Sequence, residues 1–235
     1  MRFSHPPHDR SITICTPGQR QWYRPTSPWK WGISPHFYAQ TPLAGPIPYP
    51  LVLHYQLIYP QNPSAAPEIL WDVIHPPMFA RVSSDRQFFK KWRPPDFDTE
   101  ALQPTGVKKV WILSDHSILA HWVERWGPII VLSSKSLTIR DILEGIYAYF
   151  RTPLTRDDLH HVNSIPDNRR CLRYARAQRA KDSYEIEAVV ISQGYRRIDV
   201  VGGHRKFHGL RISILPDQTW RLYMNLTPGT VPRVS

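Results

Sequence analysis

The chain has 235 residues, of which 41% are hydrophobic and nine are tryptophan. This is enough apolar surface for a substantial core, so a wholly disordered protein is excluded. The formal net charge of +11 favours acidic partners, yet it equally suits a soluble protein whose lysines and arginines are solvated. The longest apolar runs, such as Ile129–Leu132, are strand-sized and far short of the ~20 residues of a membrane span. We therefore expect no membrane association.

The two cysteines, Cys15 and Cys171, lie far apart in the sequence. A secreted domain held together by disulfides normally has more cysteines at closer spacing. We therefore expect two free thiols, although a single bridge between them is possible. Residues 1–7 contain no apolar run that could form the core of a signal peptide, so we expect a cytoplasmic or nuclear protein that is not secreted.

The prolines are concentrated at the N-terminus, where ten of the 24 lie within the first 50 residues. This predicts a partly disordered, proline- and aromatic-rich leader over residues 1–49, one folded domain over 50–227 and a short tail over 228–235. Exposing several leader tryptophans together would be unfavourable. The leader either packs on its own domain or serves as a ligand for the aromatic groove of a partner.

The first half of the domain is predicted to consist of strands. The β-rich segments are 51–59, 69–74, 107–113 and 128–132. Residues 83–106 are mixed and charged, and we expect an insertion loop there. A short helix fits between the third and fourth strands, at about 115–126.

Three helices follow in succession. The firmest prediction is 139–150, where five apolar residues repeat on one face of a 3.6-residue period: Ile139, Ile142, Leu143, Ile146 and Phe150. Thr138 and Asp141 provide a capping box for it. Similar starts at Thr155 and Ser164 predict a second helix to about residue 162 and a third to about residue 181.

The C-terminal part returns to strands. Residues 195–201 are predicted as a strand, 204–208 as a loop, and 210–215 with 220–226 as an antiparallel hairpin, because apolar and polar residues alternate there. Strands, then helices, then strands without a regular alternation predict an α+β fold. We expect a mainly antiparallel sheet with two or three helices packed on one face.

Five short segments together resemble a fungal, mostly basidiomycete, family known as a domain of unknown function, number 6699. They are Trp71-Asp72, Leu137–Leu143, Tyr195–Val200, Phe207–Leu210 and Trp220–Leu222. The resemblance covers about residues 50–226. It implies domain limits and a fold, and it implies no activity, cofactor or substrate. Within or close to these segments lie the candidate pocket or signature residues Trp71, Asp72, Arg197, Asp199, His204, Gly209 and Trp220.

Catalytic motifs are missing from the sequence. Asp72, Asp199 and His204 could form an acid–base set if the strands bring them together. The structural alternative is that Asp72 caps a strand end while Asp199 pairs with an arginine such as Arg197. His204 and His208 are four residues apart, but they fall in a predicted loop beside two cations. We therefore assign no catalytic residue, no metal site and no cofactor.

The third predicted helix is strongly basic. Its candidate partner-binding residues are Arg169, Arg170, Arg173, Arg176, Arg179 and Lys181. Such a face can bind acidic side chains or phosphates, or it can simply be solvated. We predict a non-enzymatic protein-interaction module with an unknown protein partner. The alternatives are weak nucleic-acid binding through helix 169–181, and a hydrolase or transferase with a site around Asp72, Asp199 and His204.

Overall fold

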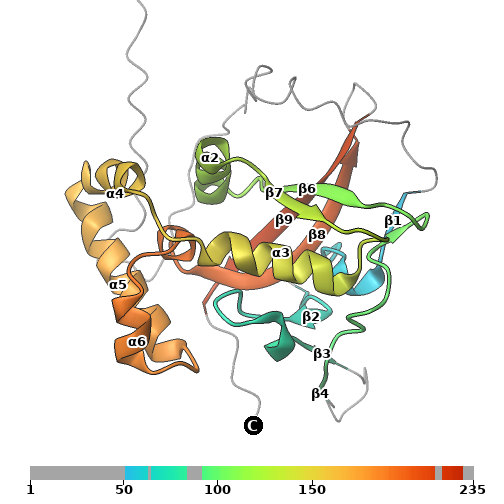
Figure 1. Ribbon diagram of the computed structural model, residues 1–235, viewed down its shortest axis with the longest axis horizontal. Coiled ribbons are helices and arrows are strands. Elements are labelled where there is room, and N and C mark those ends of the chain that lie inside the picture. The colour runs from blue at the N-terminus through green and yellow to red at the C-terminus, as the bar shows by residue number, and fades with distance from the viewer. Residues whose placement is uncertain (1–50, 63–64, 84–91, 215–218, 230–235) are drawn as a thin grey trace, which may run out of the picture.

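The computed structural model describes residues 51–62, 65–83, 92–214 and 219–229 (Figure 1). The predicted leader, residues 1–49, lies outside the described residues, as do residues 230–235 of the predicted tail. The strands are β1 (Val52–Leu53), β2 (Ile69–Leu70), β3 (Arg81–Ser83), β4 (Trp92–Arg93), β5 (Leu102–Gln103), β6 (Lys109–Leu113), β7 (Ile129–Leu132), β8 (His204–Ile214) and β9 (Trp220–Pro228). The α-helices are α2 (Ser117–Trp126), α3 (Ile139–Arg151), α4 (Arg156–Asn163), α5 (Pro166–Asp182) and α6 (Glu187–Ser192). The 3-10 helices are η1 (Tyr55–Leu57), η2 (Pro77–Phe79) and η3 (Arg197–Val200).

The principal sheet has the strand order β7-β6-β9-β8. Its pairs are antiparallel except β6 with β9, which run parallel. The predicted hairpin is confirmed as β8–β9, but β8 already begins at His204, so the loop predicted for 204–208 is wrong. Polar side chains at His204 and Lys206 alternate with the buried Arg205 and Phe207, and the charge of this segment obscured the strand period in the sequence.

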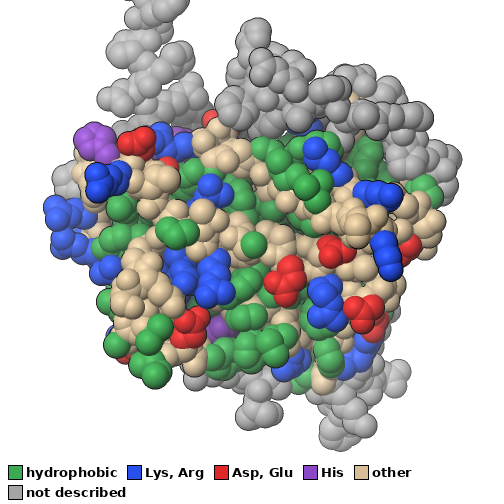
Figure 2. Space-filling view, in the orientation of Figure 1, with side chains coloured by type: hydrophobic (Ala, Val, Ile, Leu, Met, Phe, Trp, Pro, Cys, Tyr) green, Lys and Arg blue, Asp and Glu red, His purple; other side chains and the backbone are tan. Residues whose placement is uncertain are grey.

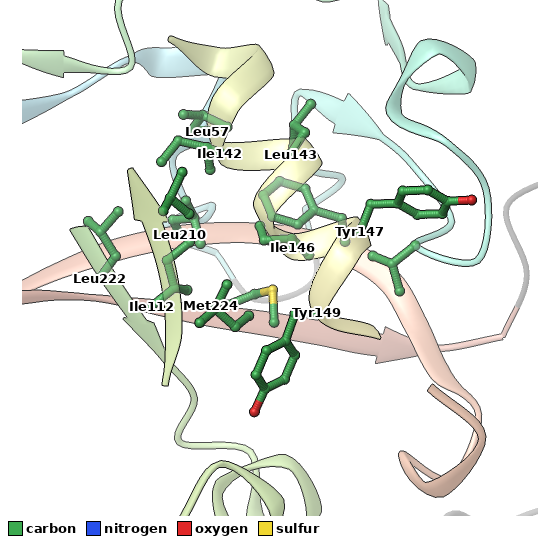
Figure 3. Close-up of a cluster of buried hydrophobic side chains, with 14 of the residues drawn as sticks. Leu57, Ile112, Ile142, Leu143, Ile146, Tyr147, Tyr149, Leu210, Leu222 and Met224 are labelled. Carbon is green, nitrogen blue, oxygen red and sulfur yellow. The ribbon is translucent and has the colours of Figure 1, made fainter. Parts of the chain in front are cut away.

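Helix α3 covers one face of this sheet (Figures 1 and 3). The predicted capping box is present, because the Thr138 hydroxyl accepts from the Asp141 amide and the Asp141 carboxylate accepts from the Thr138 amide. The apolar stripe of the helix is buried against strand residues such as Ile112 and Leu222. Gly145 lets the helix approach β7 closely, since a Cβ there would lie 2.6 Å from a methyl carbon of Val131.

Helices α4, α5 and α6 gather at one end of the molecule (Figure 1). The capping box of α4, from Thr155 to Asp158, is confirmed. Helix α5 starts one residue later than predicted, with Ile165 at its N-cap and no side-chain cap. The strand predicted for 195–201 is wrong. Asp199 accepts a hydrogen bond from the Arg196 amide and closes the 3-10 helix η3 instead, a local turn that apolar periodicity does not reveal.

Two small sheets complete the fold, β1–β5 and β2–β3–β4. The predicted strands at 51–59 and 69–74 are shorter than expected, because η1 follows β1 and a turn follows β2. The expected α+β class and the mainly antiparallel pairing are confirmed. Within the described ranges, no helix combines the length and the apolar character needed to cross a membrane.

Gly209 allows two segments to meet at backbone distance. The amide of Tyr59 donates to the Leu210 carbonyl at 2.7 Å, and Ile58 pairs with Leu210 as an isolated bridge. A Cβ on residue 209 would lie 2.6 Å from the Tyr59 Cα and 2.8 Å from the Ile58 carbonyl oxygen. Gly209 also has a φ of +104°, which L side chains rarely adopt.

We expect Gly209→Ala to destabilise the domain much more than Gly106→Ala, as measured by urea denaturation. Gly106 has a similar φ of +95°, but a Cβ there would meet nothing within 4 Å. The control therefore costs about 1 kcal/mol of backbone strain, and any excess at position 209 comes from the backbone clash. Equal losses in the two variants would mean that the close approach to residues 58–59 does not contribute to stability.

Candidate functional site

The candidate carboxylate Asp199 lies in a buried ion pair. Arg179 donates to it through Nε at 2.8 Å and through Nη2 at 3.0 Å, and both side chains are almost fully buried. The same guanidinium donates to the carbonyl of Gly194 at 2.9 Å, so it also fixes the turn before η3. Both carboxylate oxygens of Asp199 therefore accept hydrogen bonds from Arg179. Arg179 is therefore a structural residue rather than part of an exposed basic face.

Arg197 does not pair with Asp199. Its guanidinium lies between two rings, 4.7 Å from the centroid of Trp126 and 4.5 Å from that of Tyr149. Burial lowers the pKa of Arg197, while Tyr149 and Asp158 oppose that shift. Asp199 does pair with an arginine, as the structural alternative expected, but the arginine is Arg179 and not Arg197, because η3 turns Asp199 towards α5 whereas Arg197 packs against α2 and α3.

The second candidate carboxylate, Asp72, is bound by Arg205. Arg205 Nε donates to Asp72 Oδ2 at 2.8 Å, and the Arg205 guanidinium also forms an ion pair with Asp182 at 2.7 Å. Backbone hydrogen bonds join the same segments, from the Val73 amide to the Arg205 carbonyl and from the Phe207 amide to the Trp71 carbonyl. Burial raises the pKa of Asp72, and the neighbouring Arg205 limits the rise.

His204 has different neighbours. Its Nδ1 lies 3.1 Å from the Val201 carbonyl oxygen, and its ring is 4.2 Å from that of His116. Burial is the main cause that lowers the pKa of both histidines, that of His116 to about 4. The structure places Asp72, Asp199 and His204 in three separate sets of contacts, and each carboxylate is bound by a different arginine.

The remaining signature residues are part of the core. Trp71 is buried against Phe207, and its indole N–H donates to the His75 carbonyl at 2.9 Å. Trp220 is buried at the start of β9. Together with Gly209, which holds the close contact described above, these residues contribute to the packing of the described fold.

The basic helix is divided between core and surface. Arg179 is buried, and Arg176 lies over the ring of Tyr195 at 4.2 Å. Arg169, Arg170, Arg173 and Lys181 are exposed, as is Tyr174 at 69%. Arg170 pairs with the exposed Asp167. The exposed basic face of α5 is therefore smaller than the sequence predicted.

A comparison with family models identifies the chain over residues 69–220, with the description "Family of unknown function". The chain belongs to this family, DUF6699. The match confirms the resemblance to family number 6699, and it includes both buried ion pairs. No curated protein and no solved structure matches the chain.

The DUF6699 segment also carries an exposed apolar patch that the sequence analysis missed. The rings of His75, Phe79 and Tyr184 are grouped, with Tyr184 4.4 Å from His75 and 4.5 Å from Phe79. Tyr184 and three apolar side chains that are close to these rings in the sequence, Met78, Ile186 and Val189, are 44–74% exposed. Figure 2 shows hydrophobic side chains gathered over α6 and near η2. The helix α6 was itself not predicted, so its apolar residues were not recognised as a surface.

A pair of histidines was also missed as a unit. The Nε2 atoms of His121 on α2 and His161 on α4 lie 3.2 Å apart. Burial, together with the charges of His161 and Arg125, lowers the pKa of His121 to about 4. No group of three or more His, Cys, Asp or Glu side chains suited to a metal ion was found among the described residues.

The expectation of two free thiols is wrong at Cys171. This residue is disulfide-bonded and buried on α5, beside Trp122 and Leu172. The other cysteine of the chain, Cys15, lies outside the described residues. The cysteines therefore give no support to the expected cytoplasmic or nuclear compartment.

We expect Asp199→Asn to lower the free energy of unfolding by about 3–5 kcal/mol, because it leaves the guanidinium of Arg179 buried and without its counter-charge. The matched control is Asp167→Asn, which removes the same charge from the exposed pair with Arg170 and costs less than about 1 kcal/mol. Chemical denaturation of both variants measures the difference. A loss at position 199 no larger than that at 167 would contradict the structural role of the pair.

We also expect stability to fall as the pH decreases from about 6.5 to about 4. The unfolded chain binds protons at its histidines near pH 6.5, whereas the folded state resists protonation of His116 and His121 until about pH 4. His121→Gln should reduce this pH slope, measured by denaturation at several pH values. His160→Gln, at the exposed neighbouring position, should leave the slope unchanged. Identical slopes in all three proteins would refute the assignment to His121.

Proposed function

We propose that this protein is a non-enzymatic protein-interaction module and that its docking surface is the apolar patch of Met78, Tyr184, Ile186 and Val189. The observation that supports this is the exposure of these four side chains on and beside a grouped set of rings. Exposed apolar side chains that adjoin one another are typical of sites where another protein binds. A partner segment that inserts apolar side chains between the rings would bury them.

The charge of the chain supports an acidic partner. The exposed face of α5 has Arg169, Arg173 and Lys181, and the whole chain has a net charge of +11. Such a field attracts acidic segments and increases the rate of association, while the apolar contacts slow dissociation. We therefore infer a partner segment that is both acidic and apolar.

The two alternatives have less support. Nucleic-acid binding would use the same basic face of α5, but Arg176 and Arg179 are already engaged with Tyr195 and Asp199. A hydrolase or transferase with a site at Asp72 and Asp199 would need carboxylates that reach a substrate. Both carboxylates are buried and bound to arginines, which makes them poor general bases.

We expect the double variant Ile186→Ser/Val189→Ser to lose a specific acidic partner without loss of stability, because both side chains are exposed. The measurement is quantitative affinity purification from nuclease-treated extracts, followed by binding of the purified partner. The control is Ile214→Ser, an exposed isoleucine at the end of β8. If the double variant retains every partner that the control retains, the apolar patch is not the docking surface.

Nucleic acid is tested in a separate titration with a labelled DNA duplex at several salt concentrations. We expect weak binding that disappears near about 0.15 M salt, since few phosphate contacts are available. Arg169→Glu/Arg173→Glu reverses two exposed charges one helical turn apart. A tight complex at about 0.15 M salt that this variant abolishes would favour the nucleic-acid alternative.

A further inference from the structure

Helices α2 and α4 bring two histidines together at the spacing of metal ligands. The Nε2 atoms of His121 and His161 lie 3.2 Å apart, and their rings are within 18° of parallel. Two imidazole nitrogens that bind one tetrahedral ion at about 2.0–2.1 Å are separated by about 3.3–3.4 Å. Both side chains are half-buried, so an ion in solution can reach the pair.

A second contact between the same helices fixes this spacing. The Nε of Arg125 and the indole N–H of Trp126 both donate to Asp158 Oδ1 at 3.0 Å, and Asp158 also belongs to the capping box of α4. This contact lies about one helical turn from the histidine pair on both helices. The packing of α2 on α4 therefore holds the two imidazoles before any ion binds.

The buried Trp122 packs against both imidazoles. Its ring is almost perpendicular to each, with centroid distances of 5.5 Å to His121 and 5.6 Å to His161. Rings that are packed against a buried indole have little rotational freedom left to lose. Binding of an ion would therefore cost little conformational entropy at these side chains.

The charges beside the pair are balanced at short range. Arg125 is the cation whose charge acts on His121, and its guanidinium forms an ion pair with Asp158 at 3.0 Å. Among the described residues, no third His, Cys, Asp or Glu completes a metal-binding group. The site would therefore have two protein ligands, with water at the remaining positions of the ion.

We propose that His121 and His161 bind one divalent transition-metal ion of the zinc, copper and nickel class through their Nε2 atoms. Imidazole nitrogen suits these ions, whereas Mg²⁺ and Ca²⁺ select oxygen ligands. Without the ion, one Nε2 donates its proton to the other. When the ion binds, that proton moves to Nδ1 of the same ring by exchange with water, so both Nε2 atoms present a lone pair and two neutral rings release no net proton.

The ion would link α2 to α4 and so stabilise the folded chain. A ligand that binds only the folded state raises the melting temperature by mass action. We expect a rise of about 5–10 °C at a Zn²⁺ concentration a hundred times the Kd. The site lies on different elements from the apolar patch of η2 and α6, so this inference does not depend on the proposed function.

The first test is calorimetric titration of Zn²⁺ into the full chain after a chelator has removed bound metal. We expect His121→Gln and His161→Gln each to weaken binding at least about tenfold, since either change removes one of two ligands. The controls are His160→Gln, at an exposed position of α4, and His5→Gln/His8→Gln near the N-terminus, which should bind like the parent. Equal affinity in the parent and in all variants would overturn the site.

The second test uses the parent chain, so it does not depend on how the variants fold. The ring nitrogens of ¹⁵N-labelled histidines are followed by NMR during titration with Zn²⁺ and, separately, with Mg²⁺. We expect Zn²⁺ to shift the Nε2 signals of His121 and His161 together and to leave those of His160 in place, while Mg²⁺ shifts none of them. Unchanged His121 and His161 signals at millimolar Zn²⁺ would refute the proposal.

Discussion

Arg205 joins three segments that are distant in the sequence. Its guanidinium binds Asp72, which follows β2, and Asp182, the last residue of α5, while Arg205 itself belongs to β8. Backbone hydrogen bonds from residues 71–73 to β8 bring the opposing charges within reach. Burying an ion pair costs desolvation that the attraction only partly recovers, as the raised pKa of Asp72 indicates. The pair therefore contributes mainly by penalising any arrangement that separates β2, β8 and α5.

The Arg179–Asp199 pair also joins segments that are distant in the sequence. It connects α5 to η3, and through Gly194 it connects α5 to the turn that follows α6. Both pairs tie the helical end of the molecule to the segments around β8, and the family match contains them both. The residues that first suggest chemistry in this sequence, two aspartates near arginines, therefore organise the fold.

The sequence predicts those structural features that depend on residues close together in the chain. The capping boxes at Thr138 and Thr155 and the apolar stripe of α3 were predicted because each is complete within one or two helical turns. The strand predicted at 195–201 failed because Asp199 closes a turn whose stability depends on Arg179, 20 residues earlier. The partner of Asp199 could not be read from the sequence, since several arginines lie nearer and only the packing of α5 selects one.

Packing between distant segments also explains why the exposed surface of α5 and α6 differs from the one predicted. Six basic residues on one helix suggested a continuous positive face, but the position of α5 against η3 directs Arg179 inwards and places Arg176 on Tyr195. Conversely, Ile186 and Val189 resemble core residues in the sequence, yet α6 is a short helix at the end of the domain and leaves them exposed. Whether the apolar residues of a helix face solvent depends on what the helix packs against in the folded domain. We propose that another protein binds to the surface that combines such residues with the remaining charges of α5, where the contact area would stabilise the complex and the charge would set the rate of encounter.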